Sequence, residues 1–285
     1  GLSIFKDKEK MRELLAPMYD GTHKEAFTVY AQGHGHLDMA WLWPIRETKR
    51  KALRTFSNVL FQSENVPGFS YNVSQPQQFE FVREQSPELF EKLKEAAKTG
   101  VIEPQGGMWV EADTNLAGGE ALIRQCVYGK RYFREEFGVD VKTLWLPDVF
   151  GYSAALPQIV KKSGMDNFMT IKLSWNRDNQ FPHHSFLWTG LDDSEVLVHM
   201  PPLGDYTADA DPAAVRGTWE KYREKQINDE ALMLFGFGDG GGGPGEYHMN
   251  MVTRCAKMRH LPRVELSGSA PFFEKLHQHR DAFPT

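Results

Sequence analysis

The chain has 285 residues, and α/β barrels commonly form a single domain of about 250 residues. Its composition, 41% hydrophobic and 25% charged, is typical of a globular protein and argues against a disordered chain. The net charge is -5, and basic residues are scattered among acidic ones without forming a stripe. Nucleic acids and anionic membrane surfaces are therefore not expected as partners.

Only two cysteines occur, Cys126 and Cys255, and neither has a Cys or His at metal-ligand spacing. We expect both to be buried free thiols, which favours a reducing compartment. The first eight residues include no Met and no continuous apolar run, so they predict neither a signal peptide nor a membrane span. No stop signal follows the last helix-like run, and we expect further sequence on both sides of the chain.

Residues 1–26 predict a helical lead-in, and residues 27–285 predict one α/β domain. In the latter, short β-branched and aromatic runs alternate with longer amphipathic stretches, a pattern typical of βαβ units with parallel strands. The seven expected strands cover residues 27–32, 69–73, 101–105, 143–146, 168–171, 196–199 and 232–237. The expected helices cover residues 45–62, 80–99, 119–137, 154–163, 212–225 and 246–258.

Polar side chains follow the ends of these strands, where a β/α barrel carries its catalytic groups. His36 and Asp38 flank Leu37 after the first strand, so in an extended segment both point to one side and could share a divalent ion. This pair alone is a weak signal, because a loop histidine with a salt bridge has the same sequence. Asp148, after the fourth strand, adds a third ligand, although it could instead cap the following helix.

Three protein ligands with an open position are typical of a catalytic metal rather than a structural one. A structural tetrahedral zinc would need thiolates, and none stands near these residues in the sequence. Two carboxylates and one imidazole suit zinc, cobalt and manganese in differing degrees. The residues therefore predict a catalytic metal site at His36, Asp38 and Asp148 and leave the identity of the metal open.

A glycine run at residues 236–243 contains Asp239 and follows the seventh strand. It lacks the Gly-Lys-Ser/Thr end of a phosphate-binding P-loop, and Asp239 would repel an anion. We interpret the glycines as letting the backbone approach a sugar closely, with Asp239 as a candidate acid/base. Hydrolysis of a glycosidic bond needs one ionised and one protonated carboxylate, and Asp148 and Asp239 fit these two roles.

Aromatic residues crowd the same loops, and flat rings suit the apolar faces of sugars. Trp41, three residues after Asp38, is the first candidate for stacking on a substrate. Phe150 follows Asp148, and Lys172 and Trp175 follow the fifth strand. For any single aromatic residue, packing in the core explains its presence at least as well.

Five segments resemble the α-mannosidases of glycoside hydrolase family 38, in the right order over roughly residues 30–270. They are GHGHLDMAWLWP at 33–44, GGMWVE at 106–111, LPDVFGYS at 146–153, KLSWN at 172–176 and GFGDGGGGP at 236–244. These segments are most similar to those of the cytosolic, vacuolar and bacterial branch of the family. The resemblance therefore implies a cytoplasmic enzyme that acts on mannose-containing oligosaccharides.

The resemblance also implies a seven-stranded β/α barrel and net retention of anomeric configuration. It assigns zinc, replaceable by cobalt in some members, to His36, Asp38 and Asp148. Asp148 would also be the nucleophile and Asp239 the acid/base. Trp41, Phe150, Lys172 and Trp175 would bind the substrate.

One departure from the family concerns its fourth metal ligand, a histidine beyond the glycine run, because no segment here resembles it. His277 and His279 lie in a predicted charged amphipathic helix, and we treat them as surface residues. We hypothesise that this chain alone binds metal poorly and is weakly active or inactive, and that any homo-oligomer uses domains beyond it. Two alternatives remain open: a metal-dependent barrel hydrolase or deacetylase that activates water, and a carbohydrate-binding remnant without turnover.

Overall fold

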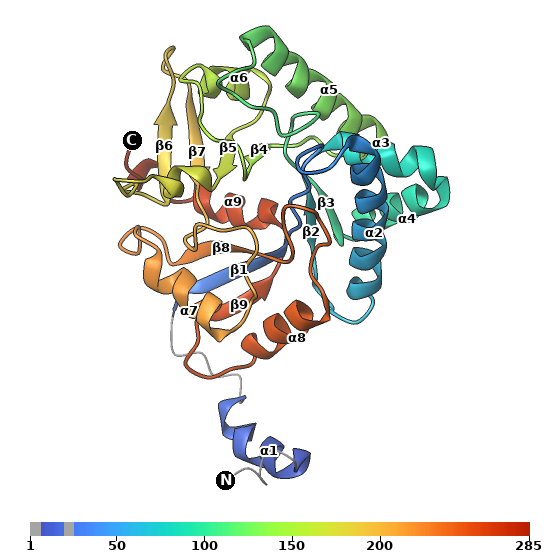
Figure 1. The fold of residues 1–285 in the computed structure, drawn as a ribbon. Helices are drawn as coiled ribbons and strands as arrows, with labels where there is room; N and C mark the ends of the chain where they lie inside the picture. The colour runs from blue at the N-terminus through green and yellow to red at the C-terminus, as the bar shows by residue number, and fades with distance from the viewer. Residues whose placement is uncertain (1–6, 20–25) are drawn as a thin grey trace.

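Figure 1 shows a computed structural model in which residues 7–19 and 26–285 are described. The N-terminal described segment forms helix α1 (Lys8–Leu15), whose first turn is capped by Asp7 through a hydrogen bond from the Lys10 backbone N–H. The expected helical lead-in contains this helix. Its residues 1–6 and 20–25 lie outside the described part of the chain.

The described residues form nine strands in two sheets. The larger sheet is all parallel, in the order β3 (Ile102–Pro104), β2 (Tyr71–Val73), β1 (Thr28–Gly33) and β8 (Glu230–Phe235), with β9 (Arg263–Leu266) paired to the start of β1. The smaller sheet has the order β4 (Thr143–Leu146), β5 (Asn167–Thr170), β7 (Glu195–His199) and β6 (Ser185–Thr189), the last antiparallel. The expectation of an α/β fold with parallel strands is confirmed.

Each of the seven expected strands is present, with its ends within two residues of the expected ones, and β6 and β9 are additional. β6 forms a hairpin with β7 whose turn is closed by a hydrogen bond from Gly190 N–H to the Ser194 carbonyl. β6 ends on the half-buried Trp188 and exposed Thr189, and β9 alternates charged and apolar residues. Neither strand is therefore a continuous apolar run, which was the pattern used to predict the buried strands.

The expected closed seven-stranded barrel is not found in the described residues. On one side the sheets nearly join, because Gly106 after β3 forms a bridge with Leu144 of β4. On the other side β6 occupies the edge of β7 that would have to pair with β8. There the His199 side chain accepts a hydrogen bond from Leu232 N–H at 3.3 Å, so one imidazole spans the seam in place of a strand ladder.

Most helices lie on the outside of the two sheets (Figure 1). They are α2 (Ile45–Ser63), α3 (Pro76–Gln85), α4 (Pro87–Lys98), α5 (Gly119–Phe137), α6 (Leu156–Lys162), α7 (Pro212–Lys221) and α8 (Glu246–Cys255). The single helix expected over residues 80–99 is two helices, because Ser86 leaves the helical conformation before Pro87. None of the described helices has the length and apolar character needed to cross a membrane. Cys126 and Cys255 are buried free thiols, as expected.

Helix α9 (Ser269–His277) lies between the two sheets, in the middle of Figure 1. Its Phe272, Phe273 and Leu276 side chains are almost fully buried and belong to one apolar cluster with residues of both sheets, namely Tyr30, Leu232, Leu234, Trp145, Met169 and Leu197. Burying each such side chain contributes about 1.5–3 kcal/mol to folding. The helix therefore fills the interior that the open sheets leave, on the side away from the loops that follow their strands.

Candidate active site

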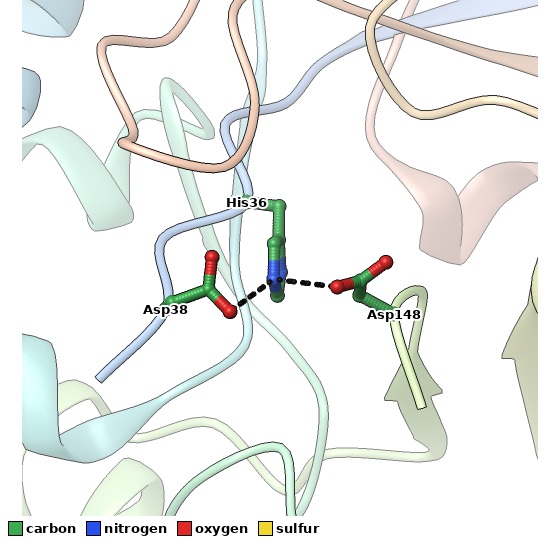
Figure 2. Close-up of side chains that lie close together, drawn as sticks. All are labelled: His36, Asp38 and Asp148. Atoms are coloured by element: carbon green, nitrogen blue, oxygen red, sulfur yellow. Dashed lines mark ion pairs between the residues drawn. The ribbon is translucent and has the colours of Figure 1, made fainter. Parts of the chain in front are cut away.

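His36, Asp38 and Asp148 converge at the carboxyl ends of the strands. Figure 2 shows the His36 imidazole between the two carboxylates: His36 Nε2 lies 3.6 Å from Asp38 Oδ1 and 3.5 Å from Asp148 Oδ2. His36 and Asp38 follow β1, and Asp148 follows β4, so strand packing brings them together from distant sequence. One potential ligand atom from each lies within 4.8 Å of the others. A cavity of about 220 Å³ adjoins them.

The donor set fits a divalent metal ion. His36 Nε2 is buried, makes no hydrogen bond within the described residues, and faces two carboxylates. On the other side of the ring, Nδ1 lies 2.9 Å from Glu111 Oε2, an ion-pair contact. A proton on Nδ1, facing that carboxylate, would leave the Nε2 lone pair to a metal.

The electrostatics of His36 point to the same conclusion. Burial alone would lower its pKa, but the carboxylates of Glu111 and Asp38 outweigh burial and raise the pKa to about 10. Without a metal, His36 is therefore protonated, and its imidazolium supplies the positive charge between these carboxylates. A divalent ion would supply that positive charge instead, with the imidazole neutral and coordinated.

Glu111 is itself held in place by side chains that follow β2. Ser74 Oγ donates to Glu111 Oε1 at 2.5 Å, and Gln75 Oε1 accepts from the Glu111 backbone N–H at 3.2 Å. Gln75 Nε2 also donates to the Leu37 carbonyl at 3.1 Å. This network ties the loops after β1, β2 and β3 together around the His36 ring.

Asp148 is held by a buried lysine. Lys172 Nζ lies 2.6 Å from Asp148 Oδ1. The same ammonium lies 3.1, 4.9 and 5.3 Å from the ring centres of Trp175, Phe150 and Tyr206. Rings around a cation stabilise it and keep water away. Lys172 therefore compensates the charge of Asp148 and restricts its rotation.

Tyr206 connects the two candidate catalytic carboxylates. Its hydroxyl oxygen lies 2.8 Å from Asp239 Oδ1 and 3.1 Å from Asp148 Oδ1. Because one oxygen contacts both, these two carboxylate oxygens are closer than the roughly 6.5 Å at which inverting pairs begin. Burial, and then the two carboxylates, raise the pKa of Tyr206, so the hydroxyl keeps its proton as a donor.

The glycine run places Asp239 beside the candidate metal ligands. Gly241 N–H donates to the His36 carbonyl at 3.1 Å, and Asp38 N–H donates to the Asp239 carbonyl at 3.3 Å. A side chain on Gly236 would meet the His34 carbonyl at 2.3 Å, so the close approach is to the protein's own backbone. Asp239 has φ of 52°, a strained conformation of the kind found at functional sites.

Trp41, Phe150 and Trp175 are 57%, 67% and 58% exposed, so core packing does not account for them. Phe150 and Trp175 flank Lys172, whereas the Trp41 ring packs edge-on against Trp43 with ring centres 5.7 Å apart. All three rings are available to a ligand.

The two late histidines lie apart from the converging ligands. His277 Nε2 lies 2.7 Å from Asn167 Oδ1, at the amino end of β5 and thus at the opposite end of the strand from the site. His279 is exposed. Among the described residues, the only side chains grouped closely enough to bind a metal ion together are His36, Asp38 and Asp148.

The sequence analysis missed Glu111 and Tyr206 as site residues. Glu111 stands in the GGMWVE segment that follows the third expected strand, so its position was a signal, but its role depends on the His36 ring beside it. Tyr206 follows the sixth expected strand by several residues, and only its contact with both carboxylates distinguishes it.

Similarity to known proteins agrees with this geometry. The chain is 42% identical over 252 residues to "Alpha-mannosidase G" of Dictyostelium discoideum, covering 88% of this chain and 23% of that protein. It is 45% identical over 264 residues to "Alpha-mannosidase 2C1" of Mus musculus, covering 92% of this chain and 25% of that protein. The chain thus spans about a quarter of the length of these curated relatives.

A crystal structure of an alpha-mannosidase from Enterococcus faecalis V583 has the same fold, with a TM-score of 0.73 at 17% identity, covering 91% of this chain and 30% of that one. Residues 26–285 match the family described as glycosyl hydrolases family 38 N-terminal domain. This match includes every residue of the candidate site. The chain therefore belongs to glycosyl hydrolase family 38.

Proposed function

We propose that the protein containing this chain is a retaining α-mannosidase that removes terminal α-linked mannose from oligosaccharides. The observation that carries the proposal is the Tyr206 hydroxyl, which contacts both Asp148 and Asp239 and so holds two carboxylates at a separation suited to retention. The mannose specificity is supported by the names of the relatives that are 42% and 45% identical.

In this proposal a carboxylate oxygen of Asp148 attacks the anomeric carbon as the bond to the leaving oxygen breaks. Asp239 gives its proton to that oxygen, and a glycosyl ester forms on Asp148. Asp239 then takes a proton from water, which attacks the anomeric carbon and releases Asp148. Lys172 and Tyr206 hold the Asp148 side chain in position for this attack. Trp41, Phe150 and Trp175 would contact the sugar rings.

We assign a metal to His36, Asp38 and Asp148 and propose zinc, with cobalt or manganese as substitutes. When bound, the ion would supply a positive charge that orients sugar hydroxyls and favours the ionised nucleophile. Glu111 would fix the ring of the histidine ligand. A fourth ligand would come from outside this chain, so this chain alone would bind metal weakly and turn over little substrate.

We also propose the domain bounds, the location and the origin of any homo-oligomer contacts. Residues 1–26 are a lead-in and residues 27–285 are the catalytic domain. The location is cytoplasmic, because the two cysteines are buried free thiols, a usage typical of reducing compartments. Any homo-oligomer would form through parts of the protein beyond this chain.

The proposal is tested by measuring metal content together with hydrolysis of an aryl α-mannoside. Both this chain and a longer form that continues past residue 285 are compared, with Asp148→Asn as the control. We expect zinc and turnover mainly in the longer form, and a loss of turnover of more than about a thousandfold in the Asn variant. A fluorinated mannoside should become covalently attached to Asp148.

Other results would favour the alternatives. Bound metal without glycoside turnover in the longer form would favour a water-activating hydrolase or deacetylase. Sugar affinity without any turnover would favour a carbohydrate-binding remnant.

A further inference from the structure

A second cavity, of about 510 Å³, opens beside the candidate active site and has no role in the mechanism above. Aromatic and apolar side chains line part of it, and two cations, Lys221 and Arg223, line another part. Lys221 is the last residue of α7, and Arg223 follows it in the loop toward β8. The lining residues with the clearest chemistry are Trp175, Gln180, Phe181, His184, Lys221 and Arg223.

Trp175 belongs to both the cavity and the candidate active site. Its indole N–H donates to the Gly204 carbonyl at 2.9 Å, which fixes the ring. The same ring lies over Lys172 Nζ, which binds Asp148. Gly204 also lines the cavity and stands two residues before Tyr206, which contacts Asp239. The cavity therefore adjoins the site through Trp175 and Gly204, so a sugar linked to the mannose that is cleaved would extend toward it.

The two cations of the cavity lack acidic partners within the described part of the chain. Arg223 donates to the Pro182 carbonyl at 3.1 Å and to Gln180 Oε1 at 3.0 Å, contacts that fix the guanidinium without neutralising it. Among residues 7–19 and 26–285, none makes a hydrogen bond or ion pair with the Lys221 side chain, and no Asp or Glu lines the cavity.

The nearby carboxylate of Glu224 is turned away into the protein. Its oxygens lie 3.1 Å from His183 Nδ1 and accept from the backbone N–H groups of His184 and Ser185 at 3.1 and 3.0 Å. Burial, and then the charges of Arg223 and Lys221, lower the pKa of His184 to about 4, and these two exposed cations in the lining make the field at the cavity wall positive. In a chain of net charge -5, such a field selects for an anionic ligand.

We propose that this cavity binds a phosphate group carried by the leaving sugar of the substrate. Lys221 and Arg223 would hold the phosphate oxygens, and Trp175 and Phe181 would contact the sugar ring. A neutral sugar fits less well, because each hydroxyl both donates and accepts, whereas the charged side chains here only donate. This inference rests on the proposed function and adds a class of substrate to it.

The test uses two dimannosides with the same α-linkage that differ only in a phosphate on the reducing sugar. Their affinities for the Asp148→Asn form are measured by calorimetry, so no turnover is needed. We expect the phosphorylated compound to bind about tenfold more tightly, as a charge-assisted hydrogen bond allows, and this advantage to shrink as salt increases. Adding Lys221→Gln should reduce the advantage, because only Arg223 then remains to hold the phosphate, and should change the affinity for the neutral compound much less.

Lys225→Gln is the matched control, because Lys225 belongs to the same basic segment but donates to the Glu220 carbonyl and does not line the cavity. Equal affinity for the two dimannosides, or a preference that Lys221→Gln leaves undiminished, would overturn the proposal. Inorganic phosphate that binds as tightly as the phosphorylated sugar would also overturn it, in favour of a free anion.

Hydrolysis by the unaltered protein is measured separately in the longer form. A phosphate preference in binding, without hydrolysis of either dimannoside, would count against the proposed mannosidase activity and not against the cavity. Hydrolysis of both dimannosides with the same KM would support the mannosidase activity and count against phosphate binding in the cavity.

Discussion

The contact between His36 Nδ1 and Glu111 Oε2 leaves Nε2 as the nitrogen of the imidazole that faces Asp38 and Asp148. We expect Glu111→Gln to weaken binding of Co²⁺ or Zn²⁺ by about 10- to 100-fold, because the partner of a ligating histidine orients the ring and raises its basicity. Calorimetric titration of the metal-free protein gives this number without any activity assay. The visible spectrum of bound Co²⁺ should also shift if the histidine is reoriented.

Glu224→Gln is the control for the loss of a buried carboxylate, because Glu224 binds His183 and backbone N–H groups away from the three converging ligands. We expect its metal affinity to equal that of the unaltered protein. If Glu111→Gln also binds metal normally, Glu111 has no part in positioning His36.

The hydroxyl of Tyr206 is the contact shared by Asp148 and Asp239, so Tyr206→Phe removes one hydrogen bond to a charged group in the site. We expect kcat for an aryl mannoside to fall by about 10- to 100-fold, with a smaller change in KM, as the loss of such a bond predicts. The control is Tyr222→Phe, since the Tyr222 hydroxyl contacts Ser185 and Asn228 in the interior. A normal kcat in the Tyr206 variant would contradict the role given to this hydroxyl.

At the scale of elements, helix α9 depends on one carboxylate from a neighbouring strand. Glu103 of β3 accepts hydrogen bonds from the Ser269 and Ala270 backbone N–H groups, each at 2.9 Å, at the N-terminus of the helix. A negative charge at this end also interacts favourably with the helix dipole. The position of α9 between the sheets therefore rests on Glu103 as well as on its aromatic side chains.

We expect Glu103→Ala to lower the free energy of unfolding by about 1–3 kcal/mol, because the two N–H groups and the Ser269 hydroxyl lose their acceptor. Urea unfolding measures the loss, and hydrogen exchange should quicken first in α9. Glu274→Ala, at an exposed position of the same helix, should change neither quantity. Equal stability of the two variants would show that packing alone holds the helix.

Local patterns in the sequence predicted the elements better than their assembly. The helix at residues 119–137 and the strand at residues 143–146 were predicted with their observed bounds, since helical periodicity and a continuous apolar run are local signals. β6 was not predicted because it is a short edge strand in a hairpin, with polar residues at both ends. Its presence at the edge of β7 is what keeps the two sheets open, so the missed strand and the unconfirmed barrel have one cause.

At the scale of the whole molecule, buried histidines make stability depend on pH, and His199 and His184 are two of them. Burial lowers the pKa of His199 well below 6.5, and burial with nearby cations lowers that of His184 to about 4. Below pH 6.5 the unfolded chain binds protons at both residues before the folded chain does. Each proton bound only by the unfolded chain lowers stability by about 1.4 kcal/mol per pH unit.

We therefore expect the free energy of unfolding to decrease as the pH falls from 6.5 towards 4, as measured by urea titrations of the metal-free protein. His184→Gln should make this dependence shallower, because it removes one of these groups. His279→Gln, at an exposed position, should leave the dependence unchanged. A slope unaltered by His184→Gln would assign the pH dependence to other residues.

The sequence by itself determined the order of strands and helices and the residues that follow the strands. It thereby brought His36, Asp38 and Asp148 into one predicted site, because parallel strands end on one side of a sheet. Its motifs also indicated the family that the match over residues 26–285 shows. These features depend on local periodicity and on short runs of residue types, which one sequence contains in full.

Only the tertiary structure decided which side chains act together around that site. Tyr206 meets Asp148 and Asp239 across 58 and 33 residues of sequence, and Glu111 meets His36 from another strand. The opening between the sheets, the position of α9 and the cavity beside Trp175 also depend on tertiary packing. Such contacts follow from how sheets and helices pack. No local pattern encodes them, because each segment by itself could pack equally well against other neighbours.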